Sequence, residues 1–350
     1  MVGVKMGIDF GSANVTVFVE GKGIVFREPS VVICDASTGK PLVIGREARR
    51  MLGKLPPSMY PLFPIRDGVV NDFGAAKMML TRYIDRVAGK KLFRPSVLLC
   101  VPSTVNELAK KSLFNLMMEA GAGRVCFVGE ALAAAVGAGV SLTEPRGVCV
   151  CDMGGSVTDV AVVTMGNIAA ARSVSVGGDL LTRAIAEYVL RKYRVELGEP
   201  EAERVKRSVG SAVSRREEIA VSACGKHADS GLPTFAEVSS TEVYGVLQPY
   251  LETVLNGIRD VLEEVSPELC GDLLDSGVIL TGGGALLGGM AEWLREALGV
   301  PVVCAEDAEN RAAEGVGRLL KNMKYLERNG YVFAAEEEDG YAQNEGRTAP

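Results

Sequence analysis

Short apolar runs separated by glycine-rich turns open the chain. The runs Val4–Asp9, Asn14–Glu20 and Gly23–Glu28 have the length and composition of β-strands, which predicts a three-stranded meander. A mixed, proline-punctuated stretch follows to about Asp72. The apolar spacing then predicts an alternation of helices and strands, namely helix Phe73–Val87, strand Ser96–Val101, helix Asn106–Gly121, strand Val125–Val128 and an alanine-rich helix that runs to Gly139.

The same pattern then starts again. Runs at Gly147–Asp152, Thr158–Thr164 and Ile168–Val174 form a second three-strand set with a glycine-rich first turn. Asp9 and Asp152, which end the first strand of each set, lie 143 residues apart. Recurrence of a whole strand–turn–strand unit at half the chain length predicts a duplicated fold.

The second half continues with further helices and strands and ends in an acidic tail. The expected elements are helices Leu180–Tyr193 and Glu199–Ser208, a polar segment Val209–Ser239, helices Ser240–Val265 and Pro267–Leu274, strand Gly277–Leu280, helix Leu286–Leu298, strand Val300–Ala305 and helix Ala308–Leu326. From about Glu327 the chain is acidic and contains glycine, which predicts disorder.

Composition limits the class of protein. The 350 residues carry a net charge of −6 and form no long Lys/Arg run, so nucleic acid is not expected as a partner. Residues Met1–Asp9 are too short for a signal peptide and read as a strand. The longest apolar stretches, Ala131–Leu142 and Gly147–Ala171, are too short or carry aspartates, so neither is expected to span a membrane. A cytoplasmic protein is expected.

Cysteine and histidine chemistry is not favoured. The eight cysteines lie mostly in apolar runs without a CxxC motif, which is typical of reduced, buried thiols, and Cys149 and Cys151 are expected to pack in a core. The single histidine, His227, cannot make a zinc site by itself.

Three glycine-rich turns carry the candidate chemistry. Two follow the strand-ending Asp9 and Asp152, and the third, Thr281–Gly284, lies between a strand and a helix. Glycine lets backbone N–H groups approach a phosphate, and two aspartates that face each other could hold a hydrated Mg²⁺ against nucleotide phosphates. Each turn alone would more often be an ordinary hairpin or helix cap. The three together, two of them duplicated, favour a nucleotide cleft.

These motifs resemble the two phosphate loops and the adenosine loop of the actin/DnaK/sugar-kinase ATPase superfamily. Within it, the chain is similar to the MreB/Mbl family of bacterial actin-like cell-shape proteins from about residue 4 to 320. The segments that carry the resemblance include Glu28-Pro29-Ser30-Val31-Val32, Arg66-Asp67-Gly68-Val69-Val70-Asn71-Asp72-Phe73, Gly177-Gly178-Asp179, Ser230-Gly231-Leu232-Pro233 and Ala305-Glu306-Asp307. The resemblance implies an α/β, ribonuclease H-like, duplicated two-lobe fold with mixed five-stranded sheets and two small subdomains.

The lobes are expected at 1–145, with a small subdomain at about 30–72, and at 146–326, with a small subdomain at about 180–245. The resemblance implies ATP and Mg²⁺ as cofactors, with Asp9 and Asp152 beside the metal. The residues that it implies for nucleotide binding are Gly11, Ser12, Ala13, Asn14, Gly154, Gly155, Ser156, Thr158, Glu203, Lys206, Gly282, Gly283, Gly284 and Ala285. Without the family, Glu203 and Lys206 would more often be an exposed ion pair on one helical face.

The resemblance also implies catalytic carboxylates at Glu130, Asp152 and Asp159. The chain departs from the family here. The family usually reads Glu-Glu-Pro where this chain has Gly129-Glu130-Ala131, and Gly-Gly-Gly-Thr-Thr-Glu where it has Gly154-Gly155-Ser156-Val157-Thr158-Asp159. Val157 lacks a hydroxyl and Asp159 is one methylene shorter than glutamate. Because a misplacement of about 1 Å can cost roughly 10²-fold in rate, slow ATP hydrolysis is the expectation.

The loop Lys90-Lys91-Leu92-Phe93-Arg94-Pro95 places two large apolar side chains among three cations. This composition suits insertion into an anionic membrane surface, although Leu92 and Phe93 could instead begin the following strand and pack inward. The resemblance favours membrane contact. It further implies self-assembly into filaments at the inner face of the cell membrane, with RodZ, MreC and the elongation wall-synthesis proteins as partners.

Three alternatives remain open. A small-molecule kinase could use the same fold, but such kinases are usually longer. A chaperone of the DnaK type would need a substrate-binding domain, for which residues 327–350 are too few. A divergent paralogue that co-assembles with a main family member and hydrolyses little ATP agrees with the departures at Gly129, Ala131, Val157 and Asp159.

Overall fold

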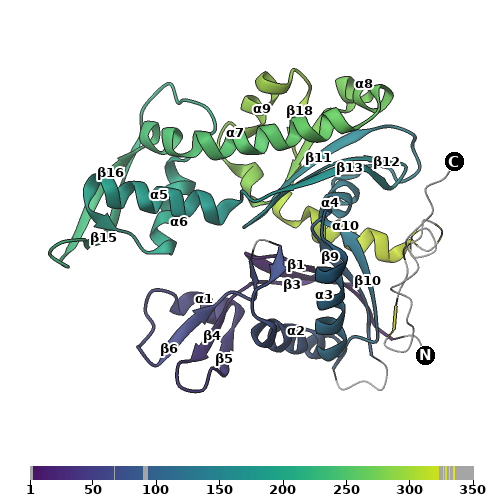
Figure 1. Ribbon diagram of the computed structural model, residues 1–350, viewed down its shortest axis with the longest axis horizontal. Helices are drawn as coiled ribbons and strands as arrows, with labels where there is room; N and C mark the ends of the chain where they lie inside the picture. Colours follow the sequence, from purple (N-terminus) through teal and green to yellow (C-terminus); the bar gives the residue numbers. More distant parts are fainter. Residues whose placement is uncertain are drawn as a thin grey trace.

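The computed structural model describes residues 3–66, 68–89 and 94–322, together with residues 326, 328, 331, 334 and 335. Two mixed sheets dominate the fold, one in each half of the chain. Figure 1 shows the first half below and the second half above, with helices α4 (Glu130–Ala138) and α10 (Arg311–Lys321) between them.

The first sheet has the strand order β10-β9-β1-β2-β3. Its strands are β1 (Lys5–Phe10), β2 (Asn14–Val19), β3 (Gly23–Pro29), β9 (Ser96–Val101) and β10 (Arg124–Gly129). Strand β1 pairs antiparallel with β2 and parallel with β9. Helices α2 (Phe73–Ala88) and α3 (Glu107–Glu119) begin at Asp72 and Asn106, whose side chains accept hydrogen bonds from backbone N–H groups three residues later.

The second sheet repeats this topology in the order β13-β12-β11-β17-β18. Its strands are β11 (Val148–Met153), β12 (Thr158–Thr164), β13 (Asn167–Val174), β17 (Val278–Thr281) and β18 (Val302–Cys304). Strand β11 pairs antiparallel with β12 and parallel with β17, as β1 does with β2 and β9. Helices α7 (Ser240–Glu264), α8 (Pro267–Ser276) and α9 (Met290–Leu298) pack against this sheet. The predicted duplication is therefore confirmed in the topology.

Helices α4 and α10 join the two lobes. They approach so closely that a Cβ built on Gly315 would lie 1.7 Å from the Ala133 carbonyl oxygen, and one on Gly137 would lie 1.9 Å from that of Arg311. Apolar side chains from both sheets close around the pair, Leu98 from the first sheet and Val150 from the second among them. The two sheets therefore share one continuous hydrophobic core around α4 and α10, and we call this region the base of the molecule.

Each lobe carries a smaller sheet that the apolar pattern did not predict. In the first lobe β4 (Val32–Asp35), β5 (Pro41–Ile44) and β6 (Met59–Leu62) form a sheet beside α1 (Gly45–Met51), and β7 (Ile65–Arg66) pairs with β8 (Val69–Val70). In the second lobe β14 (Val195–Glu196), β15 (Ala220–His227) and β16 (Pro233–Ser239) lie beside α5 (Gly178–Tyr193) and α6 (Glu199–Val209). These strands are short or mostly solvent-exposed, so their sequence lacks a strong apolar alternation.

Two predicted helices are shorter than expected. The stretch 286–298 divides into a 3₁₀ turn, η1 (Gly283–Leu286), and helix α9, because Gly289 adopts a φ of +72° at the boundary. Similarly, η2 (Ala308–Asn310) precedes α10, which ends at Lys321. The prediction of buried thiols is wrong for Cys224, Cys270 and Cys304, which are exposed.

Among the helices of the described residues, none combines the length and hydropathy needed to cross a bilayer. The predicted membrane residues Leu92 and Phe93 lie outside the described residues. So does 336–350, the end of the acidic tail, whereas Ala334 forms a bridge with Val125 at the edge of the first sheet.

Candidate functional site

Strand register aligns polar side chains in two equivalent rows. In the first sheet Asp9 on β1 lies opposite Thr16 on β2, which lies opposite Arg27 on β3. Paired residues share a face of the sheet, so the three side chains point the same way. The equivalent row in the second sheet, from β17 to β13, is Thr281, Asp152, Asp159 and Ser173.

A cavity of about 1080 Å³ lies between the lobes. Fifteen of the predicted site residues line it, namely Asp9, Gly11, Ser12, Ala13, Asn14, Glu130, Asp152, Gly154, Gly155, Ser156, Glu203, Lys206, Gly282, Gly283 and Gly284. Thr158, Asp159 and Ala285 are buried behind the wall. The structure therefore brings all three glycine-rich turns to one cleft, as predicted from the sequence.

The two hairpins have the same local geometry and touch each other. The Gly11 N–H donates to the Asn14 carbonyl at 3.1 Å, and the Gly154 N–H donates to the Val157 carbonyl at 2.9 Å. A Cβ built on Gly155 would lie 2.7 Å from the Ala13 Cβ and 2.9 Å from the Ser12 Oγ. The lobes therefore meet at the two hairpins, where exposed backbone amides can bind an anion.

Three carboxyl groups converge at the hairpins. Burial raises the pKa of Asp9 to about 6 against the opposing effect of Arg27, and burial together with the negative charges of Asp9 and Asp159 raises the pKa of Asp152 to about 7. Burial and the negative charges of Asp9, Asp159 and Asp152 hold the pKa of Glu130 well above its ordinary value. The Thr281 hydroxyl donates to Asp152 Oδ1 at 2.7 Å and orients that carboxylate.

This donor set fits Mg²⁺. Within the described part of the chain, no three metal-ligating side chains gather closely enough to hold an ion unaided. Mg²⁺ normally takes one or two carboxylates and completes its shell with water and substrate phosphates. Asp9 and Asp152 would supply those carboxylates, and the cation would offset the charge that burial disfavours.

We expect the apo protein to lose thermal stability as the pH rises from about 4 to 7, between the ordinary aspartate pKa and the raised pKa values of Asp9 and Asp152. In that window the folded state holds protons on Asp9 and Asp152 that the unfolded chain, with an ordinary aspartate pKa, has already lost. The melting temperature should fall by roughly 2–5 °C, and Mg²⁺ with a nucleotide should reverse the fall. Differential scanning fluorimetry across the range tests this. The variant Asp152→Asn should show a shallower slope, and an equal slope would contradict the assignment.

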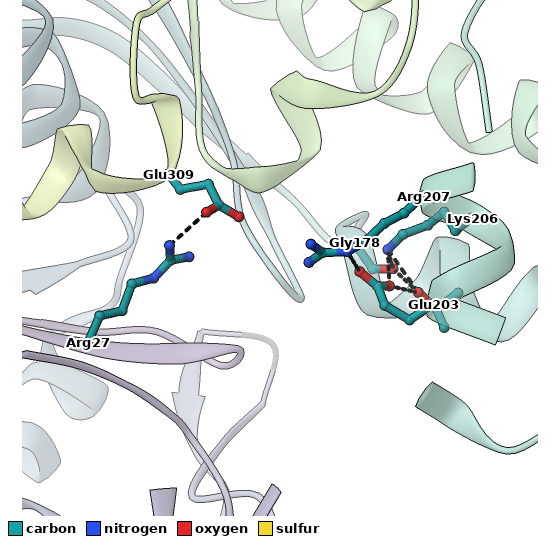
Figure 2. A network of polar contacts seen from close by, with 7 residues as sticks. Arg27, Gly178, Glu203, Lys206, Arg207 and Glu309 are labelled. Atoms are coloured by element: carbon teal, nitrogen blue, oxygen red, sulfur yellow. Dashed lines mark hydrogen bonds and ion pairs between the residues drawn. The ribbon is translucent and has the colours of Figure 1, made fainter. Parts of the chain in front are cut away.

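Glu203 and Lys206 project from α6 into the other side of the cavity. Lys206 Nζ lies 2.6 Å from Glu203 Oε2 and also donates to the Gly178 carbonyl at 2.7 Å, and the lysine side chain is only 12% exposed (Figure 2). The Glu203 carboxylate also accepts from Arg207 Nε at 2.7 Å and from the Thr182 hydroxyl at 2.6 Å. The alternative interpretation as an ordinary exposed ion pair is wrong, because the Lys206 and Glu203 side chains are only 12% and 21% exposed and line the cleft.

Asp159 occupies a different environment from the other carboxylates. Its Oδ2 accepts hydrogen bonds from the Ser103 N–H at 3.0 Å, the Ser103 hydroxyl at 2.5 Å and the Ala131 N–H at 3.3 Å, and its Oδ1 accepts from the Ser173 hydroxyl at 2.5 Å. Its side chain is completely buried. The carboxylate thus ties the second sheet to the loop after β9 and to the start of α4, and its predicted catalytic role stays a prediction.

Several charged residues to which the sequence analysis assigned no role in the site also line the cavity. They are Arg27, Arg49, Arg66, Asp179, Arg183, Arg207 and Glu309. The strand register would have found Arg27, because a three-stranded meander with Asp9 opposite Thr16 places Arg27 in the same row. Glu309 follows Ala305-Glu306-Asp307 but belongs to no glycine-rich turn, so its sequence gives no comparable signal.

The duplicated sheets and the interlobe cleft define the actin-like class of two-lobe folds. The family model for the MreB/Mbl protein matches residues 3–328. The chain belongs to the MreB/Mbl family.

Individual relatives agree with this membership. The chain is 40% identical to the cell shape-determining protein Mbl of Bacillus subtilis (strain 168). The alignment spans 324 residues and covers 92% of this chain and 97% of the relative. It is 37% identical over 322 residues to the cell shape-determining protein MreB of Escherichia coli (strain K12). This alignment covers 90% of this chain and 93% of the relative. The crystal structure of MreB 5 of Spiroplasma citri bound to AMPPNP is similar at a TM-score of 0.88 and 33% identity, covering 94% of this chain and 99% of that chain.

Proposed function

We propose that this cell-shape protein binds ATP with Mg²⁺ in the interlobe cleft and assembles into filaments on the inner face of the cell membrane. The observation that carries the nucleotide proposal is the convergence of both hairpins, Gly282–Gly284 and two buried aspartates on one cavity. The Spiroplasma relative binds AMPPNP, an ATP analogue, and the shared fold supports the same site here. We place the boundary between the lobes after residue 145.

Each part of the site has a distinct task. The amides of the two hairpins bind phosphate oxygens, and Asp9 and Asp152 hold the cation, which supplies charge neutralisation at the phosphates. Glu203 and Lys206 flank the nucleoside, while Gly282 begins the turn beneath it. That turn requires glycine, since Gly282 has a φ of +78° and a Cβ there would lie 2.4 Å from the Met153 carbonyl oxygen.

Gly155→Ala should weaken ATP binding by at least about tenfold, because the added methyl group forces the two hairpins apart. Isothermal titration calorimetry with a non-hydrolysable ATP analogue and Mg²⁺ measures the change. The matched control is Gly245→Ala in α7, where a Cβ meets nothing within 4 Å. Equal affinity in both variants would show that nucleotide binds elsewhere.

Slow hydrolysis remains part of the proposal. Val157 lines the cavity at the tip of the second hairpin, where it offers a methyl group and no hydroxyl. This observation favours the second candidate, a slowly hydrolysing paralogue that co-assembles with a main family member.

The variant Val157→Thr is expected to raise the ATP turnover number by about tenfold through a hydroxyl that can orient water. Phosphate release under saturating ATP measures it. Valine and threonine have the same shape, so the substitution leaves packing unchanged. An unaltered rate would show that Val157 is not the cause of slow turnover.

Filament formation and membrane contact rest on family membership and on the apolar pair Leu92 and Phe93 flanked by cations. Two inserted side chains bind weakly, and assembly multiplies the contacts into avidity. Filaments held in this way would direct wall synthesis and rod shape together with RodZ, MreC and the elongation wall-synthesis proteins.

Electron microscopy of the full chain on anionic vesicles, with and without Mg²⁺-ATP, tests this proposal. Nucleotide-dependent filaments on the lipid support it. Replacing Leu92 and Phe93 with serine should release filaments from the vesicles and leave their assembly intact. Monomers under all conditions would overturn autonomous assembly, and mixing with a main family member would then test the co-assembling paralogue.

A further inference from the structure

One ion pair crosses the cleft from the first lobe to the second. Arg27 on β3 donates from Nη1 to Glu309 Oε2 on η2 at 2.8 Å (Figure 2). The two residues are 282 positions apart in the chain. Among the salt bridges between described residues, this is the one that joins the two lobes.

Both partners lie at the rim of the cavity. They line it, yet their side chains keep 29% and 31% of their surface exposed, whereas Asp152 deeper in the cleft is buried. Further contacts between the lobes include those of α4 and α10 at the base, the hydrogen bonds of Asp159, the touching hairpins and the Thr104 hydroxyl, which donates to the Ser173 Oγ at 2.7 Å. Glu309 lies on η2, which leads directly into α10, so the ion pair joins the two lobes at the cleft wall next to the base.

Each partner is also held beside the proposed nucleotide. Arg27 stands in the row of Asp9 and Thr16, and its positive charge acts on the Asp9 carboxyl group. Glu309 lies against the glycine turn, since a Cβ on Gly283 would be 3.4 Å from its Oε1, and the Gly282 N–H donates to the Ala308 carbonyl at 2.9 Å. A separation of the lobes that moves β3 away from η2 must break this ion pair.

We propose that the Arg27–Glu309 ion pair is a latch between the two walls of the cleft that slows release of bound nucleotide. This proposal rests on the proposed function, because it concerns the same cleft and the same ligand. A half-buried pair joined by a charge-assisted hydrogen bond is worth enough to change an opening equilibrium several-fold, and salt weakens it.

Stopped-flow release of a fluorescent N-methylanthraniloyl-ATP from the full chain, chased with excess ATP, tests the latch. Arg27→Gln and Glu309→Gln should each raise the dissociation rate about three- to tenfold, and the double variant should be no faster than either single one. Raising the salt concentration should speed release from the wild type more than from the variants. The matched control is Lys77→Gln, which breaks a 2.7 Å ion pair with Glu119 inside the first lobe and should leave the rate unchanged.

The outcomes separate the two proposals. Unchanged rates in both single variants, or effects that multiply in the double variant, overturn the latch and leave nucleotide binding standing. If Arg27→Gln weakens binding while Glu309→Gln strengthens it, the arginine is a phosphate ligand restrained by Glu309, and the latch is wrong. A wild type that fails to bind the fluorescent nucleotide overturns the proposed function and, with it, the latch.

Discussion

Replacing Glu130 with glutamine is expected to lower the ATP turnover number by roughly 10²- to 10³-fold with little change in nucleotide affinity. Glu130 is the first residue of α4, it lines the cavity, and it stands with Asp9 and Asp152 at the cleft. Phosphoryl transfer needs a group that orients or deprotonates the attacking water, and a carboxyl whose pKa lies closer to neutrality performs that task efficiently.

The pH dependence distinguishes this role from a structural one. Burial and the negative charges of Asp9, Asp159 and Asp152 raise the pKa of Glu130. Because the ionised form is the base, turnover by the wild type should rise with pH through that raised pKa. In the Glu130→Gln variant the turnover number should no longer rise with pH in this way. A turnover number within about threefold of wild type at neutral pH would exclude Glu130 as the base.

The parts of the site that could be predicted from the sequence are those encoded locally. An aspartate followed by a glycine-rich turn identifies a hairpin by itself, and its recurrence after 143 residues predicts the pseudo-symmetric pair. The structure places both hairpins on one cavity. The repeat also predicts that the two large sheets share one strand order, because equal patterns adopt equal topology, and the structure has this equality.

Contacts between residues distant in the chain could not be predicted in this way. Arg27 and Glu309 meet only because η2 folds back over β3, and neither has a distinctive neighbourhood in the sequence. The resemblance implied a catalytic role for Asp159, and the strand register places it on the same sheet face as Asp152, yet Ser103 and the start of α4 enclose its carboxylate completely. Local patterns specify turns, whereas burial depends on what packs above them.

The small sheets were missed for a related reason. Strand β15 is exposed along much of its length and includes Gly225 and Lys226, so its composition is that of a polar loop. It forms because β14 and β16 supply pairing partners on both sides. Tertiary pairing of this kind overrides a weak local propensity.

Asp159→Ala is expected to lower the free energy of unfolding by about 3 kcal/mol. The substitution removes the acceptor for the N–H groups of Ser103 and Ala131, which come from the first half of the chain, and leaves the buried Ala131 N–H and the half-buried Ser103 N–H without that partner. It also removes the acceptor for the Ser173 hydroxyl. Urea unfolding followed by circular dichroism measures the loss.

The control variant is Ser173→Ala, which leaves the carboxylate with three of its four hydrogen bonds. It also removes the acceptor for the Thr104 hydroxyl, so a loss of about 1–2 kcal/mol is expected. Asp159→Glu separates the structural role from the catalytic one. A carboxylate that joins the lobes has no room for an extra methylene at a completely buried site, so this variant should be destabilised without faster hydrolysis. If Asp159→Glu instead keeps wild-type stability and hydrolyses ATP faster, the carboxylate acts on the nucleotide, and the lobe-joining role is secondary.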